Sequence, residues 1–374
     1  MISDTTHLIK INDKVNIDLK IINNFLNKKI KNIESIILVG SFGRDEGSVL
    51  VVNNKIHSIN DYDLVVVINN RSDYPDVDKL RIELAMILNI RQIDISFYLK
   101  SKLSKIKFSM FSYDLKYASK IIYGNQKILD LIPKMKSSKM PFIEGVRPLF
   151  LFLSSLLHAY PINKQIDKNQ LFWNYQQLSK SILGFSTAML IFDKKYHYSY
   201  LKRQLIFKET YDDIELYNMV KWATQFKLEP NESLLLNNEN YVLFWQNVCN
   251  TYLIVMKNCL EKYYNKNFKS WFAIISQYKF DKINILKYVY SFLFNQKKYS
   301  DSIHINIVEF LLCVILNGVN DKKHKNLLKY EYNKISNVVK IDSSFNIENL
   351  VEKILKRDPN SSIFIINREN AKIF

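Results

Sequence analysis

Residues 35–48 read SIILVGSFGRDEGS, and residues 60–68 read NDYDLVVVI. Each stretch contains an apolar run, at 36–39 and at 64–68, that predicts a short buried strand. Glycine is rare in this chain, with seven among 374 residues. Three of the seven follow the first apolar run closely, at Gly40, Gly43 and Gly47. The first predicted strand therefore ends in a glycine-rich turn, and the rest of the chain is organised around this region.

Asp61 and Asp63 lie two residues apart at the start of the second strand, so the two-residue period of a strand places both side chains on one face. Two carboxylates held this close repel each other unless a cation lies between them. A third predicted strand, at 92–98, carries Asp94 on the face opposite its apolar residues. Mg²⁺ binds one or two protein carboxylates together with phosphate oxygens and water. Asp61, Asp63 and Asp94 are therefore predicted to be catalytic and to hold two Mg²⁺ ions, with Mn²⁺ as an alternative.

The turn at residues 40–44, GSFGR, contains the kinds of residue that bind a triphosphate. Gly40 lets the backbone approach an anion closely, Ser41 offers N–H and hydroxyl donors, and Arg44 can add charge-assisted hydrogen bonds. The stretch matches neither G-x-x-x-x-G-K-[ST] nor G-x-G-x-x-G, so P-loop and dinucleotide-binding folds are excluded. Gly40, Ser41 and Arg44 are the nucleotide-binding residues that the turn predicts.

The formal net charge of +17 indicates an anionic partner, but only eight of the 53 basic residues are arginine. Arginine is preferred for reading bases and for binding phosphate bidentately, so its scarcity disfavours a nucleic-acid track. The three cysteines lie in apolar helical stretches without metal-ligand spacing, which is typical of reduced thiols. The chain does not open on an apolar signal segment, and its longest apolar stretch, 303–316, is too short and too polar to span a bilayer. A cytoplasmic protein without a membrane span is expected.

The periodicity of the chain changes near residue 141. The first 140 residues combine strands and helices, including a helix at 17–31, a hairpin at 48–59 and a strand at 120–123. Later spacing is helical and predicts helices at 145–160, 168–193, 212–227, 237–263, 281–295, 303–317 and 345–357, with a last strand at 363–366. The predicted fold class is α/β (α+β), with a mixed-sheet catalytic domain over 1–140, an all-helical domain over 141–300 and a helical extension over 301–374.

GSFGRDEGS, NDYDLVVV and RQIDISF together resemble the hG[GS]…[DE]h[DE]h…h[DE]h pattern of the DNA polymerase β-type nucleotidyltransferase superfamily. The R-x-E-G form with a hairpin before NDYD is similar to bacterial nucleotidyltransferase-domain proteins, distantly like kanamycin nucleotidyltransferase. The resemblance covers residues 35–98. It implies a mixed sheet with helices on one side, two Mg²⁺ ions, and transfer of a nucleoside monophosphate from NTP with release of pyrophosphate. One departure is Asp45, which stands where relatives usually have glycine after the arginine and makes the loop stiffer.

The helical half resembles the second domain of that family more loosely. Lys180, at the end of NYQQLSK, corresponds to a lysine that reaches the triphosphate across the cleft, and a surface lysine is the alternative. The resemblance implies ATP or another NTP as substrate and leaves the acceptor open. The scarcity of arginine favours a small hydroxylated acceptor, such as a sugar or an aminoglycoside. A toxin-type enzyme that modifies a protein or tRNA is a second hypothesis. A non-catalytic nucleotide-binding scaffold on the same fold is the third.

Overall fold

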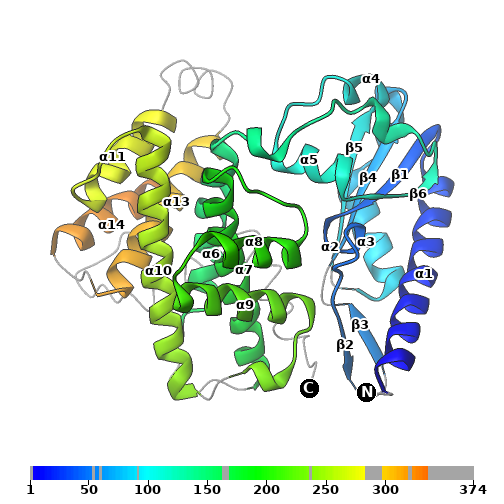
Figure 1. Ribbon diagram of the computed structural model, residues 1–374. Coiled ribbons are helices and arrows are strands. Elements are labelled where there is room, and N and C mark those ends of the chain that lie inside the picture. Colours follow the sequence, from blue (N-terminus) through cyan, green and yellow to red (C-terminus); the bar gives the residue numbers. More distant parts are fainter. Residues whose placement is uncertain are drawn as a thin grey trace.

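The computed structural model of the chain describes residues 3–52, 55–58, 61–90, 92–161, 168–235, 238–282, 297–318 and 322–335. The architecture is mixed α/β, and the described strands all lie between residues 33 and 124. We call residues 3–140 the sheet part and residues 143–335 the helical part, because the described elements of the latter are helices; the two face each other in Figure 1. The α-helices are α1 (Ser3–Lys29), α2 (Gly40–Gly43), α3 (Val77–Leu88), α4 (Lys100–Leu103), α5 (Met110–Tyr117), α6 (Ile143–His158), α7 (Lys168–Phe192), α8 (Tyr200–Thr210), α9 (Ile214–Leu228), α10 (Asn238–Tyr264), α11 (Trp271–Lys282), α13 (Lys297–Leu316) and α14 (Lys322–Ile335).

Four strands form one sheet in the order β5–β4–β1–β6. The chain forms β1 (Ile33–Val39), β2 (Val49–Val52), β3 (Lys55–Ser58), β4 (Tyr62–Ile68), β5 (Ile93–Leu99) and β6 (Lys120–Gly124). The central strands β1 and β4 are antiparallel, β5 is parallel to β4, and β6 is antiparallel to β1. The predicted hairpin is confirmed as the separate pair β2–β3. The C-terminal end of β1 and the N-terminal ends of β4 and β5 therefore meet at one edge of the sheet.

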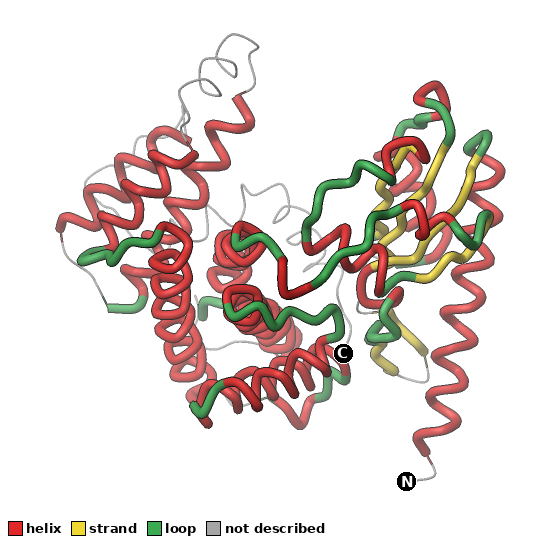
Figure 2. Tube along the Cα trace, turned by 45° about the horizontal axis from the view of Figure 1, so that its top comes forward, coloured by secondary structure: helices red, strands yellow, loops and turns green. Residues whose placement is uncertain are grey.

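Helices cover both faces of this sheet. Ile36 and Leu64 belong to a buried cluster that includes apolar residues of α1 and α3, and the neighbouring residues Ile37 and Val65 belong to a second cluster with residues of α4 and α5. The expectation of helices on one side is wrong, because β1 and β4 carry consecutive rather than alternate apolar residues and both of their faces must be buried. Figure 2 shows the strands enclosed in this way on one side of the molecule.

The helical part has one large core between α6, α7, α10 and α13. Its interior contains fully buried aromatic side chains, among them Tyr175, Trp245 and Tyr252. The predicted helices that correspond to α6, α7, α9, α10 and α13 are confirmed, with ends shifted by a few residues in most cases. Sequence periodicity missed α8, α11 and α14, because their apolar residues are few or do not form one stripe. The predicted helix at 345–357, most of that at 281–295 and the predicted strand at 363–366 lie outside the described residues.

The cysteines fit the prediction of reduced, inert thiols. Cys249, Cys259 and Cys313 are free and buried. Burial raises the pKa of the Cys259 thiol to about 12, so this thiol stays protonated at neutral pH. A search of the described helices finds none that is long and apolar enough to cross a membrane.

Candidate active site

The predicted glycine turn is a single turn of helix, α2, that begins where β1 ends. Gly40 has a φ of +65°, a backbone conformation that side chains with a Cβ rarely adopt. A methyl group at this position would also overlap the Oδ2 atom of Asp63. The backbone of the turn therefore packs directly against a carboxylate, and glycine is required at position 40 for two separate reasons. Backbone hydrogen bonds from Arg44 N to Gly40 O (3.2 Å) and from Glu46 N to Ser41 O (2.8 Å) close the turn.

Asp63 and Asp94 lie side by side, because the parallel register of β4 and β5 pairs these two residues. Burial, and then the negative charges of Asp94 and Asp61, raise the pKa of the Asp63 carboxyl to about 7. The positive charges of Lys227 and Arg44 act on Asp63 in the opposite direction. The Asp94 carboxylate is oriented by Gln92, whose Nε2 donates to Asp94 Oδ1 at 3.1 Å. The three predicted carboxylates therefore lie close enough for the charges of Asp61 and Asp94 to act on Asp63.

The three carboxylates are not arranged as a complete ligand set. Within the described part of the chain, no group of three His, Cys, Asp or Glu side chains is positioned to hold a metal ion. Asp61 precedes the first residue of β4, so the register that pairs Asp63 with Asp94 does not fix its position. The strand register thus pairs two of the predicted ligands, Asp63 and Asp94, and does not fix the position of the third, Asp61.

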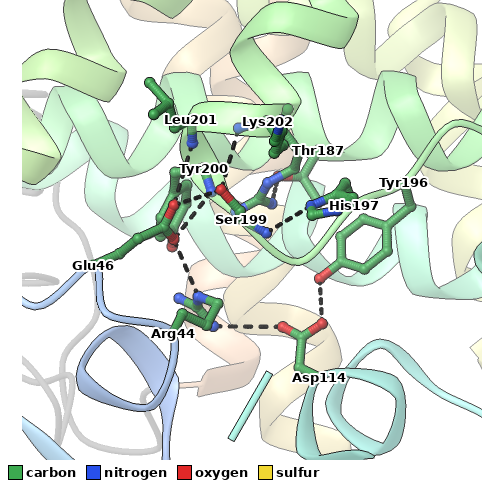
Figure 3. Close-up of polar contacts among 11 residues, drawn as sticks. Arg44, Glu46, Asp114, Thr187, Tyr196, His197, Ser199, Tyr200, Leu201 and Lys202 are labelled. Carbon is green, nitrogen blue, oxygen red and sulfur yellow. Dashed lines mark hydrogen bonds and ion pairs between the residues drawn. The ribbon is translucent and has the colours of Figure 1, made fainter. Parts of the chain in front are cut away.

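Arg44 is engaged in ion pairs inside the protein. Its Nε lies 3.3 Å from Glu46 Oε2, and its Nη1 lies 3.5 Å from Asp114 Oδ2 (Figure 3). Tyr196 donates its hydroxyl proton to the same Asp114 carboxylate at 2.8 Å, and the Tyr200 ring lies 5.1 Å from the Arg44 guanidinium. The charge that was predicted to bind phosphate is therefore balanced by two carboxylates at the boundary between the sheet part and the helical part.

Glu46 crosses that boundary and caps helix α8. Its Oε1 accepts from Ser199 Oγ at 2.7 Å and from Leu201 N at 3.3 Å, and its Oε2 accepts from Tyr200 N at 3.1 Å (Figure 3). Ser199 is itself the N-cap residue of α8, since its Oγ accepts from Lys202 N. A carboxylate at this end of a helix satisfies unpaired N–H groups and interacts favourably with the helix dipole. The R-x-E-G motif thus supplies a structural link that its sequence did not reveal.

A cleft of about 440 Å³ separates the two parts of the molecule. Arg44, Asp61 and Gln92 line it from the sheet part, and Lys180 lines it from α7. Among the predicted site residues, Gly40, Ser41, Asp63 and Asp94 are not among the residues that line it. Lys180 therefore lines the same cleft as Asp61, from the wall formed by the helical part.

Lys227 is a cleft residue that sequence reasoning missed. It lies in the last turn of α9, lines the cleft and has its Nζ 6.0 Å from the centroid of the Tyr200 ring. Although burial acts in the opposite direction, Lys227, Arg44 and Arg203 together lower the pKa of the Tyr200 hydroxyl. Lys227 is one of 45 lysines, and nothing in its local sequence distinguishes it. Only the fold reveals that its charge acts on Asp63 across the cleft.

The run YHYSYLKR, at residues 196–203, contributes both to packing and to the lining of the cleft, which includes its Tyr196, Tyr200 and Arg203. Tyr196 is buried, with its ring in a small cluster beside Met140 and Ile191. Arg203 is buried next to Tyr200, with its guanidinium 4.2 Å from the ring centroid, and donates from Nη1 to Thr187 Oγ1 at 2.5 Å. Tyr175, which the sequence grouped with Lys180, is fully buried in the helical core. Lys180 alone of that pair reaches the cleft.

Comparison with known proteins adds no assignment to this geometry. A scan against protein-family models finds no match to the chain, and a search of curated proteins finds none either.

Proposed function

We propose that this protein is a nucleotidyltransferase that moves a nucleoside monophosphate from an NTP to an acceptor hydroxyl. One observation carries the proposal: Gly40 packs against the Asp63 carboxylate at the edge of the sheet where Asp94 is also located. The turn proposed to bind the triphosphate and the carboxylates proposed to bind the cation are thereby in contact. On this proposal, residues 1–140 form the catalytic domain, 141–300 the opposite wall of the cleft, and 301–374 a helical extension.

Carboxylate oxygens are the ligands that Mg²⁺ prefers, and the chemistry of this donor set fits the ion. Asp63 and Asp94 are held side by side and repel each other, so a cation would relieve the repulsion that raises the pKa of Asp63. We propose that these two residues and Asp61 hold Mg²⁺, with two ions as the expected number and Mn²⁺ as a substitute. When bound, the metal neutralises phosphate charge and lowers the pKa of the acceptor hydroxyl.

The remaining steps fall to residues of this chain. Lys180 and Lys227 bind the β- and γ-phosphates from α7 and α9. Because Gln92 occupies Asp94 Oδ1, Asp94 Oδ2 takes the proton of the acceptor hydroxyl as its oxygen attacks the α-phosphorus. The new bond joins the acceptor oxygen to the α-phosphorus, the bond from the α-phosphorus to the bridging oxygen breaks, and pyrophosphate leaves. No protein nucleophile is required.

The proposal is tested with α-labelled ATP, CTP, GTP and UTP, incubated with and without Mg²⁺ and with a small-molecule extract as the source of acceptor. Wild-type protein is expected to move label into the acceptor fraction only with Mg²⁺. The double variant Asp61→Ala/Asp63→Ala is expected to lose the transfer, and Asp78→Ala, on the exposed side of α3, to retain it. Equal transfer by the double variant would show that these carboxylates are not the site.

A non-catalytic nucleotide-binding protein is the second candidate, and one observation favours it. The described part of the chain contains no assembled group of three metal-ligating side chains. This candidate predicts that NTP binds and is recovered unchanged, with every divalent metal and every acceptor fraction tested.

A further inference from the structure

The cleft has one wall whose polar groups carry no carboxylate. We call it the α6–α7 wall. Its uncharged hydrogen-bonding residues are Ser154, Ser155 and His158 on α6 and Gln177 and Thr187 on α7, and all five line the cleft. Phe152 and Leu183 add apolar surface beside them. Apolar surface interrupted by a few hydroxyl, imidazole and amide groups suits a small ligand with both a hydrocarbon framework and hydroxyl groups.

Gln177 carries the strongest indication of a ligand. Its side chain is 2% exposed, yet Nε2 has no hydrogen-bond partner among the described residues. Arg203 is 8% exposed and lines the same cleft, and its Nε also has no hydrogen-bond partner among the described residues. Buried donors are satisfied in most native structures, and those that are not usually indicate a missing partner. Both atoms are N–H donors, so the missing partner must accept hydrogen bonds, as hydroxyl oxygens do.

His158 adds a fixed ring to the wall. Its Nδ1 lies 2.6 Å from the carbonyl oxygen of Ser154. A carbonyl oxygen can only accept a hydrogen bond, so Nδ1 must be protonated. The side chain is 6% exposed, so the surrounding helices hold the ring in place. The wall is thus preorganised, as a binding surface requires.

The charges of the cleft indicate which ligands are unfavourable. Its lining includes four cationic side chains, Arg44, Lys180, Arg203 and Lys227, and two carboxylates, Asp61 and Asp114. A polycationic molecule would meet a net repulsion here, and none of the named polar residues of the α6–α7 wall carries a negative charge that could neutralise its ammonium groups. A triphosphate would be attracted to the cationic side chains, and the uncharged residues of the wall would remain for a second, uncharged substrate.

We propose that the α6–α7 wall binds the acceptor, and that the acceptor is an uncharged, hydroxyl-rich molecule of the sugar or cyclitol class. An aminoglycoside, which carries several ammonium groups, is disfavoured. This assignment rests on the proposed function, since it names the second substrate of the same reaction. Gln177 is its specificity-determining residue, because its buried amide selects a ligand oxygen at that point.

The experiment measures binding of the nucleotide and of the acceptor separately. A non-transferable ATP analogue with a methylene bridge between the α- and β-phosphates is titrated first, followed by a probe mixture of glucose, galactose and myo-inositol or by kanamycin A. The variant is Gln177→Leu, and the matched control is Gln176→Leu, because Gln176 is the adjacent, partly exposed glutamine on the same helix. Thermal denaturation verifies folding of each variant, and Ser155→Ala is the substitute if Gln177→Leu does not fold.

The expected result is binding of the neutral probes to wild-type protein and to Gln176→Leu, about tenfold weaker binding to Gln177→Leu, and weaker binding of kanamycin A throughout. Unchanged affinity for the ATP analogue in Gln177→Leu is also expected. Failure of all neutral probes to bind, tighter binding of kanamycin A, or loss of ATP-analogue binding in Gln177→Leu would overturn the acceptor assignment. Failure of the proposed function is a different result, in which the ATP analogue does not bind and no label is transferred.

Discussion

Ser199 Oγ donates a hydrogen bond to Glu46 Oε1 at 2.7 Å, and this contact joins the glycine-rich segment to the first turn of α8. The same carboxylate accepts from two backbone N–H groups of α8 and pairs with Arg44. The Glu46 side chain is only 10% exposed, so water replaces these partners poorly. The glycine turn is therefore positioned by the helical part as well as by the sheet from which it emerges.

Glu46→Ala is expected to lower the free energy of unfolding by about 2–4 kcal/mol, because it leaves a buried arginine and two helix N–H groups with fewer partners. Denaturant unfolding measures the change. Asp45→Asn is the matched control, since Asp45 is the adjacent residue, its ion pair with Lys120 is exposed, and asparagine tolerates its φ of +61°. That variant is expected to change stability by less than about 1 kcal/mol. Similar losses in the two variants would refute the linking role of Glu46.

Gly40→Ala is expected to destabilise the protein and to abolish label transfer. The new methyl group would meet the Asp63 carboxylate, and the positive φ would add about 1–2 kcal/mol of strain. Gly318→Ala separates these two effects, because Gly318 also has a positive φ but a Cβ there meets nothing within 4 Å. Thermal denaturation should show the smaller loss for Gly318→Ala. Equal losses would mean that the contact with Asp63 contributes nothing.

Asp63→Asn is expected to stabilise the metal-free protein, and the gain should depend on pH. The folded-state pKa of about 7 lies above the ordinary value of 3.8, because burial and the charges of Asp94 and Asp61 oppose ionisation. Below pH 3.8 the carboxyl is protonated in the folded and unfolded states alike, and the wild type carries no penalty. As pH rises from 4 through 7, ionisation favours unfolding by up to roughly 4 kcal/mol.

The difference in melting temperature between Asp63→Asn and wild type, measured in chelator, should therefore widen from pH 4 to pH 8. Added MgCl₂ should narrow it again by stabilising the wild type alone. A difference that stays constant over this range would contradict the electrostatic description of Asp63.

Lys227→Met is expected to weaken binding of the non-transferable ATP analogue about tenfold, because one charge-assisted contact to phosphate is lost. Lys227→Arg should keep most of the affinity. Lys221→Met provides the control, since Lys221 is an exposed lysine on the same helix. Calorimetric titration of the analogue distinguishes the three variants. If Lys227→Met binds as tightly as Lys221→Met, the assignment of Lys227 to the triphosphate is wrong.

Local sequence was enough to predict the strands around the site. The runs at 36–39 and 64–68 and the alternation at 92–98 all correspond to strands, and Asp63 and Asp94 lie in these strands as expected, whereas Asp61 precedes its strand. Residues whose role depends on distant partners were not predictable. Arg44 finds Asp114, Glu46 finds Ser199, and Lys227 faces Asp63 only once the sheet part and the helical part have packed together.

Helix α8 illustrates the same limit. Its first turn is stabilised by Ser199 and by Glu46, which lies on another element far away in the sequence. The run before it, rich in tyrosine and histidine, has no helical stripe of apolar residues. The Ser199 cap is local, but the Glu46 contact is tertiary, and single-sequence periodicity contains no record of it.

The position of bond cleavage in the NTP tests the central claim most directly. Wild-type protein, Mg²⁺ and a small-molecule extract are incubated in parallel with α-labelled and γ-labelled NTP. The nucleotidyltransferase predicts that α-label enters the acceptor fraction while γ-label is released as pyrophosphate, and that Asp63→Asn does neither. Release of γ-label as inorganic phosphate, or its appearance in the acceptor, would contradict attack at the α-phosphorus and identify a different phosphate chemistry.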